Sequence, residues 1–244
     1  MRKILTLVTV SSLLFGGCAT TQQGGSQPSK TVTGAAIGAA IGAIAGAATG
    51  PKHHKGKRIL IGAAAGALIG GAVGYILDQQ AEQLGNDLGV KPVDNTNPEV
   101  KPTEPPISEE KPVAVVKEPN RVKVVMKDTV LFDFNSYHLK SEAKDVLRRV
   151  AKTLNRDPDT VIMIIGYTDS VGNFNYNVKL SEKRAEVVRN ELVLNGVDPT
   201  RIVTFGCGPK HPIVPNNTPE GRALNRRVEI LVYPKGVTIP NPCD

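Results

Sequence analysis

The chain of 244 residues contains no tryptophan, and aromatic residues make up only 4% of it. Its net charge of +7 is moderately basic, but lysine and arginine are not gathered into dense clusters with aromatic residues between them. Proteins that bind nucleic acids use such clusters for phosphate contacts and base stacking. The composition therefore argues against a nucleic-acid partner and favours an anionic lipid or an anionic cell-wall polymer.

Histidine is also scarce, and the four histidines are His53, His54, His138 and His211. None stands at metal-ligand spacing from cysteines or carboxylates, and no Ser/His/Asp arrangement can be argued. The neighbouring pair His53 and His54 lies in the basic stretch PKHHKGKR, where a solvated loop explains it more simply than a metal site does. We therefore expect no enzyme, no cofactor and no metal.

The first 17 residues are typical of a secretory signal peptide, because two basic residues precede the short apolar run ILTLVTVSSLLF. This run is too short to span a membrane. Cys18 follows two glycines as in a bacterial lipobox, although Phe15 stands where Leu, Val or Ile is usual. We expect Cys18 to carry lipid, and Ala19 after it favours the outer membrane. The alternative is ordinary secretion with an incidental cysteine.

The chain has only two other cysteines, Cys207 and Cys243. Thiols outside the cytoplasm tend to be oxidised, so these two residues are candidates for one disulfide. Cys243 lies on the tail of residues 236–244, which is long enough to reach back toward the rest of the chain. Two free thiols are the alternative, because a sequence does not show the geometry that a disulfide needs.

Two apolar blocks, residues 34–50 and 59–77, contain no charged residue and repeat glycine at every fourth position. Small residues at this spacing let helices approach closely in membranes. At about 1.5 Å per residue the blocks would be roughly 26 and 28 Å long, close to the thickness of a hydrocarbon core. We expect residues 34–84 to form a helical hairpin, either inserted in the membrane or self-associating; a flexible spacer is the alternative. The glycines expected at such contacts are Gly38, Gly42, Gly46, Gly66 and Gly70.

The apolar blocks are flanked by polar segments. Residues 18–33 are small and polar, as in a tether, and residues 85–120 hold seven prolines among polar residues. A segment of this kind buries no core and is expected to be an extended spacer, roughly 100 Å long at about 3.1 Å per residue.

From residue 121 to about 235 the composition is that of a globular domain. The segment RVKVVMKDTVLFDF indicates a strand, a helical apolar stripe starts at Leu139, and TVIMIIG indicates a buried strand. A second helix is expected over 178–195, with Gly196 as its stop, followed by the strands RIVTFG and RRVEILVY. The order βαβαββ predicts an α/β sandwich of one sheet and two main helices.

Four motifs occur here in order: DTVLFDFNS, IIGYTDSVGNFNYNVKLSEKRAEVV, GVDPTRIVTFGCG and NNTPEGRALNRRVEI. Together they resemble the OmpA-like C-terminal domain, which also occurs in peptidoglycan-associated lipoproteins and in MotB. The glycine blocks ahead of it are similar to the glycine zipper of YiaD-type outer-membrane lipoproteins. One departure is Cys207, where an aromatic residue is common.

The resemblance implies non-covalent binding of peptidoglycan through the diaminopimelate of its stem peptide. By position, Asp169 and Arg184 match the family's carboxylate and guanidinium, and Asn177 and Asn135 match flanking polar contacts. The chemistry agrees, because the free end of diaminopimelate carries an ammonium and a carboxylate on one carbon, and the fork of arginine suits a carboxylate. We place Arg184 one turn into its helix. A purely structural Asp169–Arg184 salt bridge is the alternative.

These observations lead us to expect a lipoprotein of the outer membrane whose C-terminal domain lies in the periplasm and binds the wall. An inner-membrane stator would need an intramembrane carboxylate, and neither apolar block contains one. A peptidoglycan hydrolase would need a nucleophile, a metal or a carboxylate pair that the sequence does not offer.

Overall fold

The computed structural model describes residues 74–97, 105–133, 135–237, 239 and 241–244. The signal peptide, Cys18 and the apolar blocks up to residue 73 lie outside these ranges, and their expected roles remain predictions. The same holds for the expected contact glycines Gly38, Gly42, Gly46, Gly66 and Gly70. Among the helices in the described ranges, none combines the length and the apolar character needed to cross a membrane.

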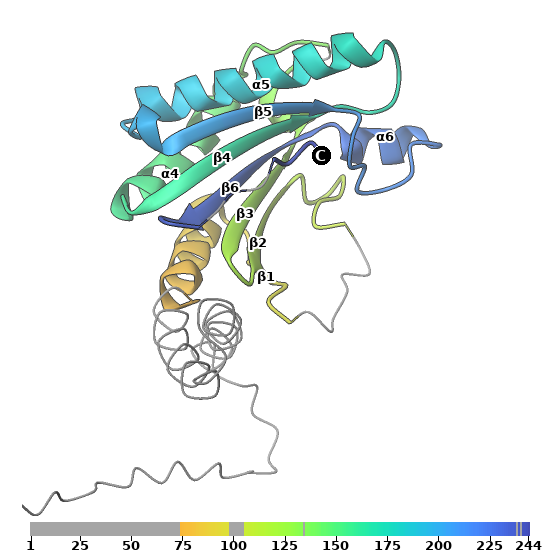
Figure 1. Ribbon diagram of the computed structural model, residues 1–244. Coiled ribbons are helices and arrows are strands. Elements are labelled where there is room, and N and C mark those ends of the chain that lie inside the picture. Colours follow the sequence, from red (N-terminus) through yellow and green to blue (C-terminus); the bar gives the residue numbers. More distant parts are fainter. Residues whose placement is uncertain (1–73, 98–104, 134, 238, 240) are drawn as a thin grey trace, which may run out of the picture.

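The described part of the chain folds around one six-stranded sheet with the strand order β1-β2-β3-β6-β4-β5 (Figure 1). β1 is parallel to β2 and β4 is parallel to β5, whereas the other neighbours are antiparallel. The strands are β1 (Val93–Asp94), β2 (Val113–Glu118), β3 (Arg121–Lys127), β4 (Thr160–Tyr167), β5 (Ile202–Gly208) and β6 (Arg227–Pro234).

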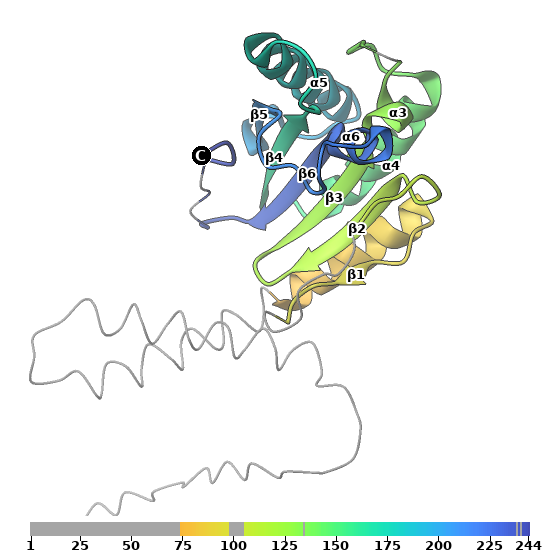
Figure 2. The ribbon, with the colours of Figure 1, turned by 90° about the vertical axis from the view of Figure 1, so that its right-hand side faces the viewer.

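Three longer helices cover one face of this sheet, as Figures 1 and 2 show. They are the helix of residues 74–88, drawn in orange beside β1 and β2, α4 (Ser141–Arg156) and α5 (Phe174–Leu194). Two short helices, α3 (Asp128–Leu131) and α6 (Pro219–Asn225), and a 3₁₀ turn, η2 (Pro199–Arg201), complete the described elements. The order β3-α4-β4-α5-β5-β6 confirms the predicted βαβαββ arrangement.

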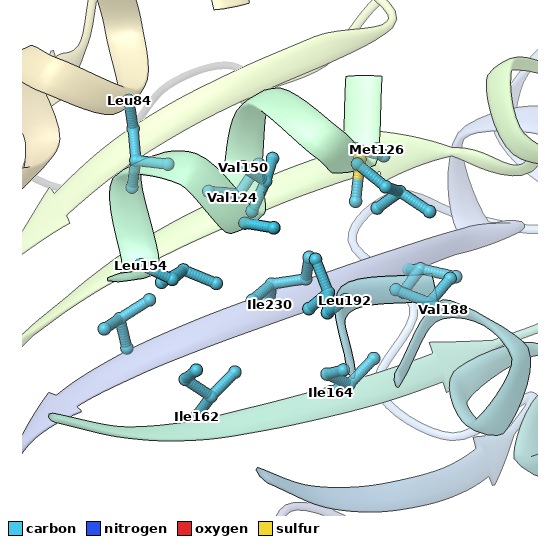
Figure 3. Packing of buried hydrophobic residues seen from close by; sticks show 14 of the residues in the cluster. Leu84, Val124, Met126, Val150, Leu154, Ile162, Ile164, Val188, Leu192 and Ile230 are labelled. Atoms are coloured by element: carbon cyan, nitrogen blue, oxygen red, sulfur yellow. The ribbon is translucent and has the colours of Figure 1, made fainter. Parts of the chain in front are cut away.

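The core lies between the helices and the sheet (Figure 3). Leu154 of α4 and Leu192 of α5 are fully buried there, because each helix turns its periodic apolar stripe toward the strands. The strands contribute β-branched residues such as Val124 and Ile230, which fit a pleated surface covered by helices. Leu84 shows that the helix of residues 74–88 belongs to the same core.

The prediction of an extended spacer over residues 85–120 is wrong for its described parts. The stretch Val113–Glu118 is strand β2, which pairs antiparallel with β3 in a register that joins Glu118 to Arg121. Pro119 and Asn120 are the only residues between the two strands, which is the two-residue loop of a β-hairpin. The β-branched residues of VAVVKE outweigh the surrounding prolines, and one proline falls in the turn, where it is tolerated.

Polar contacts also attach the helix of residues 74–88 to the domain. The buried Lys117 of β2 lies 3.3 Å from Asp78 and 3.0 Å from Glu82 of this helix. Near the other end of the helix, Asp87 accepts a 2.7 Å hydrogen bond from Thr153 of α4. The predicted boundary at residue 121 is therefore too late, because the structural unit begins no later than residue 74.

The C-terminal tail covers part of the other face of the sheet. Val237 and Ile239 pack against the cluster that includes Leu231 and Tyr233. In the structure Cys207 of β5 and Cys243 form a disulfide, and Lys210 donates a 2.7 Å hydrogen bond to the carbonyl oxygen of Cys243. The tail is therefore held at its far end by a covalent bond as well as by packing.

The disulfide closes a loop with a sequence separation of 36 residues. We expect Cys243→Ser to lower the free energy of unfolding by up to about 4 kcal/mol, because the open loop gains entropy in the unfolded chain. Urea denaturation with and without dithiothreitol measures the effect. Reductant should lower the free energy of unfolding of the wild type to that of the variant and leave the variant unchanged. A wild-type free energy of unfolding that does not respond to reductant would contradict the disulfide.

Candidate functional site

The position of α5 depends on two glycines in the strands beneath it. A Cβ on Gly166 of β4 would lie 2.1 Å from the carbonyl oxygen of Ser181, and one on Gly206 of β5 would lie 2.4 Å from the amide nitrogen of Glu182. Only glycine permits this close approach of helix and sheet. Ser181 fixes the contact further, because its hydroxyl accepts a 2.9 Å hydrogen bond from the amide of Gly208. Arg184, one turn further along α5, is thereby held close to the sheet.

Arg184 is fully buried and pairs with a carboxylate that the sequence reading missed. Its Nη1 lies 3.4 Å from Oδ2 of Asp128, and its Nε donates a 2.9 Å hydrogen bond to the carbonyl oxygen of Ser136. The guanidinium also lies 5.0 Å from the ring centroid of Phe132, within the range of a cation–π contact. Asp128 comes into place because β3 ends at Lys127 and the chain turns there into α3, whereas the sequence predicted a longer strand.

Asp169 pairs with Arg226 rather than with Arg184. The Nη1 of Arg226 lies 2.8 Å from Oδ2 of Asp169, and its Nε lies 3.1 Å from the same Asp128 oxygen that faces Arg184. The four residues therefore form an alternating charge cluster in the order Arg184, Asp128, Arg226, Asp169. We refer to these four residues as the charge cluster.

The charge cluster has a buried end and an open end. The side chains of Arg184 and Asp128 are only 2% and 8% exposed, whereas those of Arg226 and Asp169 are 24% and 13% exposed. Oδ1 of Asp128 is buried and has no hydrogen-bond partner within the described residues. The cluster thus presents one cation and one anion toward solvent.

The pKa values reflect this burial. Burial raises the pKa of Asp128 above its ordinary value of 3.8, although the charges of Arg184 and Arg226 act to lower it. Burial likewise lowers the pKa of Arg184, with Asp128 acting against it. For Arg226, burial also acts downward, but the hydrogen bond to Asp169 and the charge of Asp128 outweigh it and raise the pKa.

Of the two predicted asparagines, Asn177 lies near the start of α5 and Asn135 lies on the loop before α4. Asn177 is buried, and its Nδ2 donates a 2.8 Å hydrogen bond to the carbonyl oxygen of Val171, two residues after Asp169. Asn135 adopts a left-handed backbone with φ of 53°, which asparagine tolerates better than most residues. Its Oδ1 accepts a 3.0 Å hydrogen bond from the hydroxyl of Tyr176. Asn177 therefore shapes the loop that follows Asp169, and Asn135 shapes the loop that contacts Arg184.

The sequence predicted Asp169 and Arg184 as the charged residues of the site but missed their partners, Arg226 and Asp128. Arg184 lies almost three turns into α5 rather than one, because the helix begins at Phe174 and is capped by Asn173. Arg226 and Arg227 are neighbours at the start of β6, so their side chains point to opposite sides of the sheet. Arg226 is the one that reaches the site.

Arg227 points to the opposite face of the sheet and has a structural role. Its guanidinium lies 3.8 Å from the ring centroid of Tyr167, and its Nε lies 2.7 Å from Oε1 of Glu229. Burial and the charge of Glu229 raise the pKa of Tyr167.

Elsewhere in the described residues, no group of three histidines, cysteines or carboxylates could hold a metal ion.

Comparison with known proteins identifies the family. The model of the OmpA family matches residues 131–226, and that of the YMGG-like glycine zipper matches residues 1–78. The probable lipoprotein YiaD of Escherichia coli is 37% identical over 95% of this chain and 97% of its own length. The chain belongs to the OmpA family.

Two further comparisons cover the OmpA domain. The peptidoglycan-binding protein ArfA of Mycobacterium tuberculosis is 49% identical over 36% of this chain, which spans 27% of ArfA. A crystal structure of a putative MotB-like protein from Desulfovibrio vulgaris superposes with a TM-score of 0.54 over 67% of this chain and 98% of that one. At 22% identity this likeness shows that the OmpA-family fold is shared.

The charge cluster predicts a pH dependence of stability for this OmpA-family protein. Because the pKa of Asp128 is raised in the folded state, the folded protein binds more protons than the unfolded chain between the ordinary value of 3.8 and the raised value. The contribution of Asp128 to the free energy of unfolding should therefore fall as pH rises through this window and level off above it.

Urea denaturation of the wild type and of Asp128→Asn from pH 3.5 to 7 tests this, since other carboxyl groups are common to both proteins. The free energy of unfolding of the wild type minus that of the variant should decrease as pH rises. A difference that is constant or increases with pH would show that Asp128 is not held in the environment described.

Proposed function

We propose that this protein is a non-enzymatic lipoprotein of the outer membrane that binds peptidoglycan through diaminopimelate and thereby tethers the membrane to the cell wall. The observation that carries the proposal is the paired Arg226 and Asp169 at the open end of the charge cluster. The free end of diaminopimelate has the complementary pair of charges on one carbon. Its carboxylate would face the guanidinium groups and its ammonium would face Asp169.

The buried end of the cluster would order the open end. Asp128 holds both arginines by one oxygen, so their donors are directed before a ligand arrives. A preorganised site loses less entropy on binding than a flexible one does. The residues that match the family motif, Asp169, Arg184, Asn177 and Asn135, all contribute in this scheme, with the two asparagines holding the loops.

The relatives support peptidoglycan as the partner, because ArfA is named for binding it and YiaD is named a probable lipoprotein. The membrane anchor would be lipid on Cys18. The glycine zipper would add helix contacts through Gly38, Gly42, Gly46, Gly66 and Gly70, either in the bilayer or between copies of the chain.

Retention on insoluble peptidoglycan tests the proposal. Full-length protein in detergent should sediment with diaminopimelate-type peptidoglycan and much less with lysine-type peptidoglycan, which lacks the second carboxylate. Asp169→Asn should weaken retention at least tenfold, because a buried or half-buried charge pair contributes about 1.5–3 kcal/mol or more.

The exposed Asp159, which lies on the loop before β4, offers a matched control in Asp159→Asn. This variant should sediment like the wild type. Equal retention on both wall types, or full retention of Asp169→Asn, would contradict recognition by this site. Release of soluble fragments by the wild type would contradict a non-enzymatic role.

A further inference from the structure

A groove of about 460 Å³ lies between α5 and the loop that carries Asn135. Tyr137 lines it from the loop side, and Tyr176, Lys179 and Lys183 line it from α5. The three α5 residues are three or four positions apart, so they share one face of the helix. The groove is separate from the charge cluster, since none of the four cluster residues lines it.

The groove nevertheless adjoins the charge cluster through two neighbouring loop residues. On one side, the carbonyl oxygen of Ser136 accepts the hydrogen bond of Arg184, at 2.9 Å. On the other side, Asn135 accepts the hydrogen bond of Tyr176, at 3.0 Å. A ligand bound at the charge cluster and extending past this loop would therefore enter the groove.

The side chains of the groove combine positive charge with aromatic surface. Lys183 Nζ lies 4.9 Å from the ring centroid of Tyr137, and the exposed ring of Tyr176 faces the same space. In the part of the chain that the structure describes, neither Lys179 nor Lys183 forms an ion pair. Both ammonium groups are thus available to a ligand.

We propose that the groove takes the acidic part of the stem peptide next to diaminopimelate, with Lys179 and Lys183 binding the free α-carboxylate of its γ-linked glutamate. This inference rests on the proposed function, because it needs diaminopimelate at the charge cluster. The glutamate is joined directly to diaminopimelate and lies within one residue of it. Beyond the carboxylates of diaminopimelate itself, the glutamate carboxylate is the nearest negative charge that a ligand leaving the cluster would bring into the groove.

Two carboxylates that line the groove, Glu182 and Glu186, should have the opposite effect on the affinity for an anionic ligand. Both are exposed on α5 close to the lysines. They lower the positive potential that an anionic ligand meets. Removing the charge of Glu186 should strengthen binding of an acidic peptide, whereas removing the charge of Lys179 or Lys183 should weaken it.

The experiment compares two tripeptides by isothermal titration calorimetry on full-length protein in detergent. The first is L-Ala-γ-D-Glu-meso-diaminopimelate, and the second carries isoglutamine in place of the glutamate, so that only the α-carboxylate is neutralised. We expect the wild type to bind the amidated peptide about three- to tenfold more weakly, as for one or two exposed ion pairs. The difference should shrink as salt is raised.

The variants decide which residues are responsible. In Lys179→Gln/Lys183→Gln the preference for the acidic peptide should disappear while the amidated peptide binds as before. Glu186→Gln should bind the acidic peptide more tightly than the wild type does. Lys144→Gln/Lys152→Gln, which removes the same two charges from exposed residues of α4, should behave as the wild type.

Equal affinity of the wild type for the two tripeptides would overturn the assignment of the groove but leave diaminopimelate binding intact. An undiminished preference in the double lysine variant would overturn it too. Failure of both tripeptides to bind the wild type would contradict the proposed function itself.

Discussion

The site depends on the electrostatic constraint set by Asp128, a carboxylate that is buried where β3 ends. A charge removed from water is costly unless it is paired, and Asp128 meets this need with Arg184 and Arg226. The two arginines come from α5 and from the residue before β6, so one oxygen joins three separate parts of the chain. The open pair of Arg226 and Asp169 is aligned by this buried neighbour.

The fold meets this constraint by bringing α5 unusually close to the sheet. Gly166 and Gly206 leave room for the backbone of α5, and this places Arg184 deep enough to reach Asp128. On the outer side of the same helix, Lys179 and Lys183 face the groove beside Asn135. A single helix thus contributes to the buried end of the site and to the surface along which an extended ligand would lie.

Much of the fold could be predicted from the sequence, because periodicity and stop signals are local. The apolar stripes of α4 and α5 and the positive φ of Gly196 at the end of α5 are examples. The sequence did not predict β2, because prolines flank its short β-branched run. The two-residue turn between β2 and β3 was the signal that could have indicated it. The partners of Arg184 and Asp169 could not be predicted, because they depend on where β3 turns into α3 and on which arginine the turn before β6 directs inward.

Joint binding of the diaminopimelate carboxylate by Arg184 and Arg226 is the central proposal. The most direct measurement is NMR of the arginine Nε–Hε groups of the full-length protein during titration with meso-diaminopimelate. Arg201 and Arg227, whose Nε groups donate to Thr160 and Glu229 away from the charge cluster, serve as internal references. Saturable shifts are expected at Arg184 and Arg226, with Arg201 and Arg227 unmoved. Unmoved signals at Arg184 and Arg226, or equal shifts at all four arginines, would contradict joint binding.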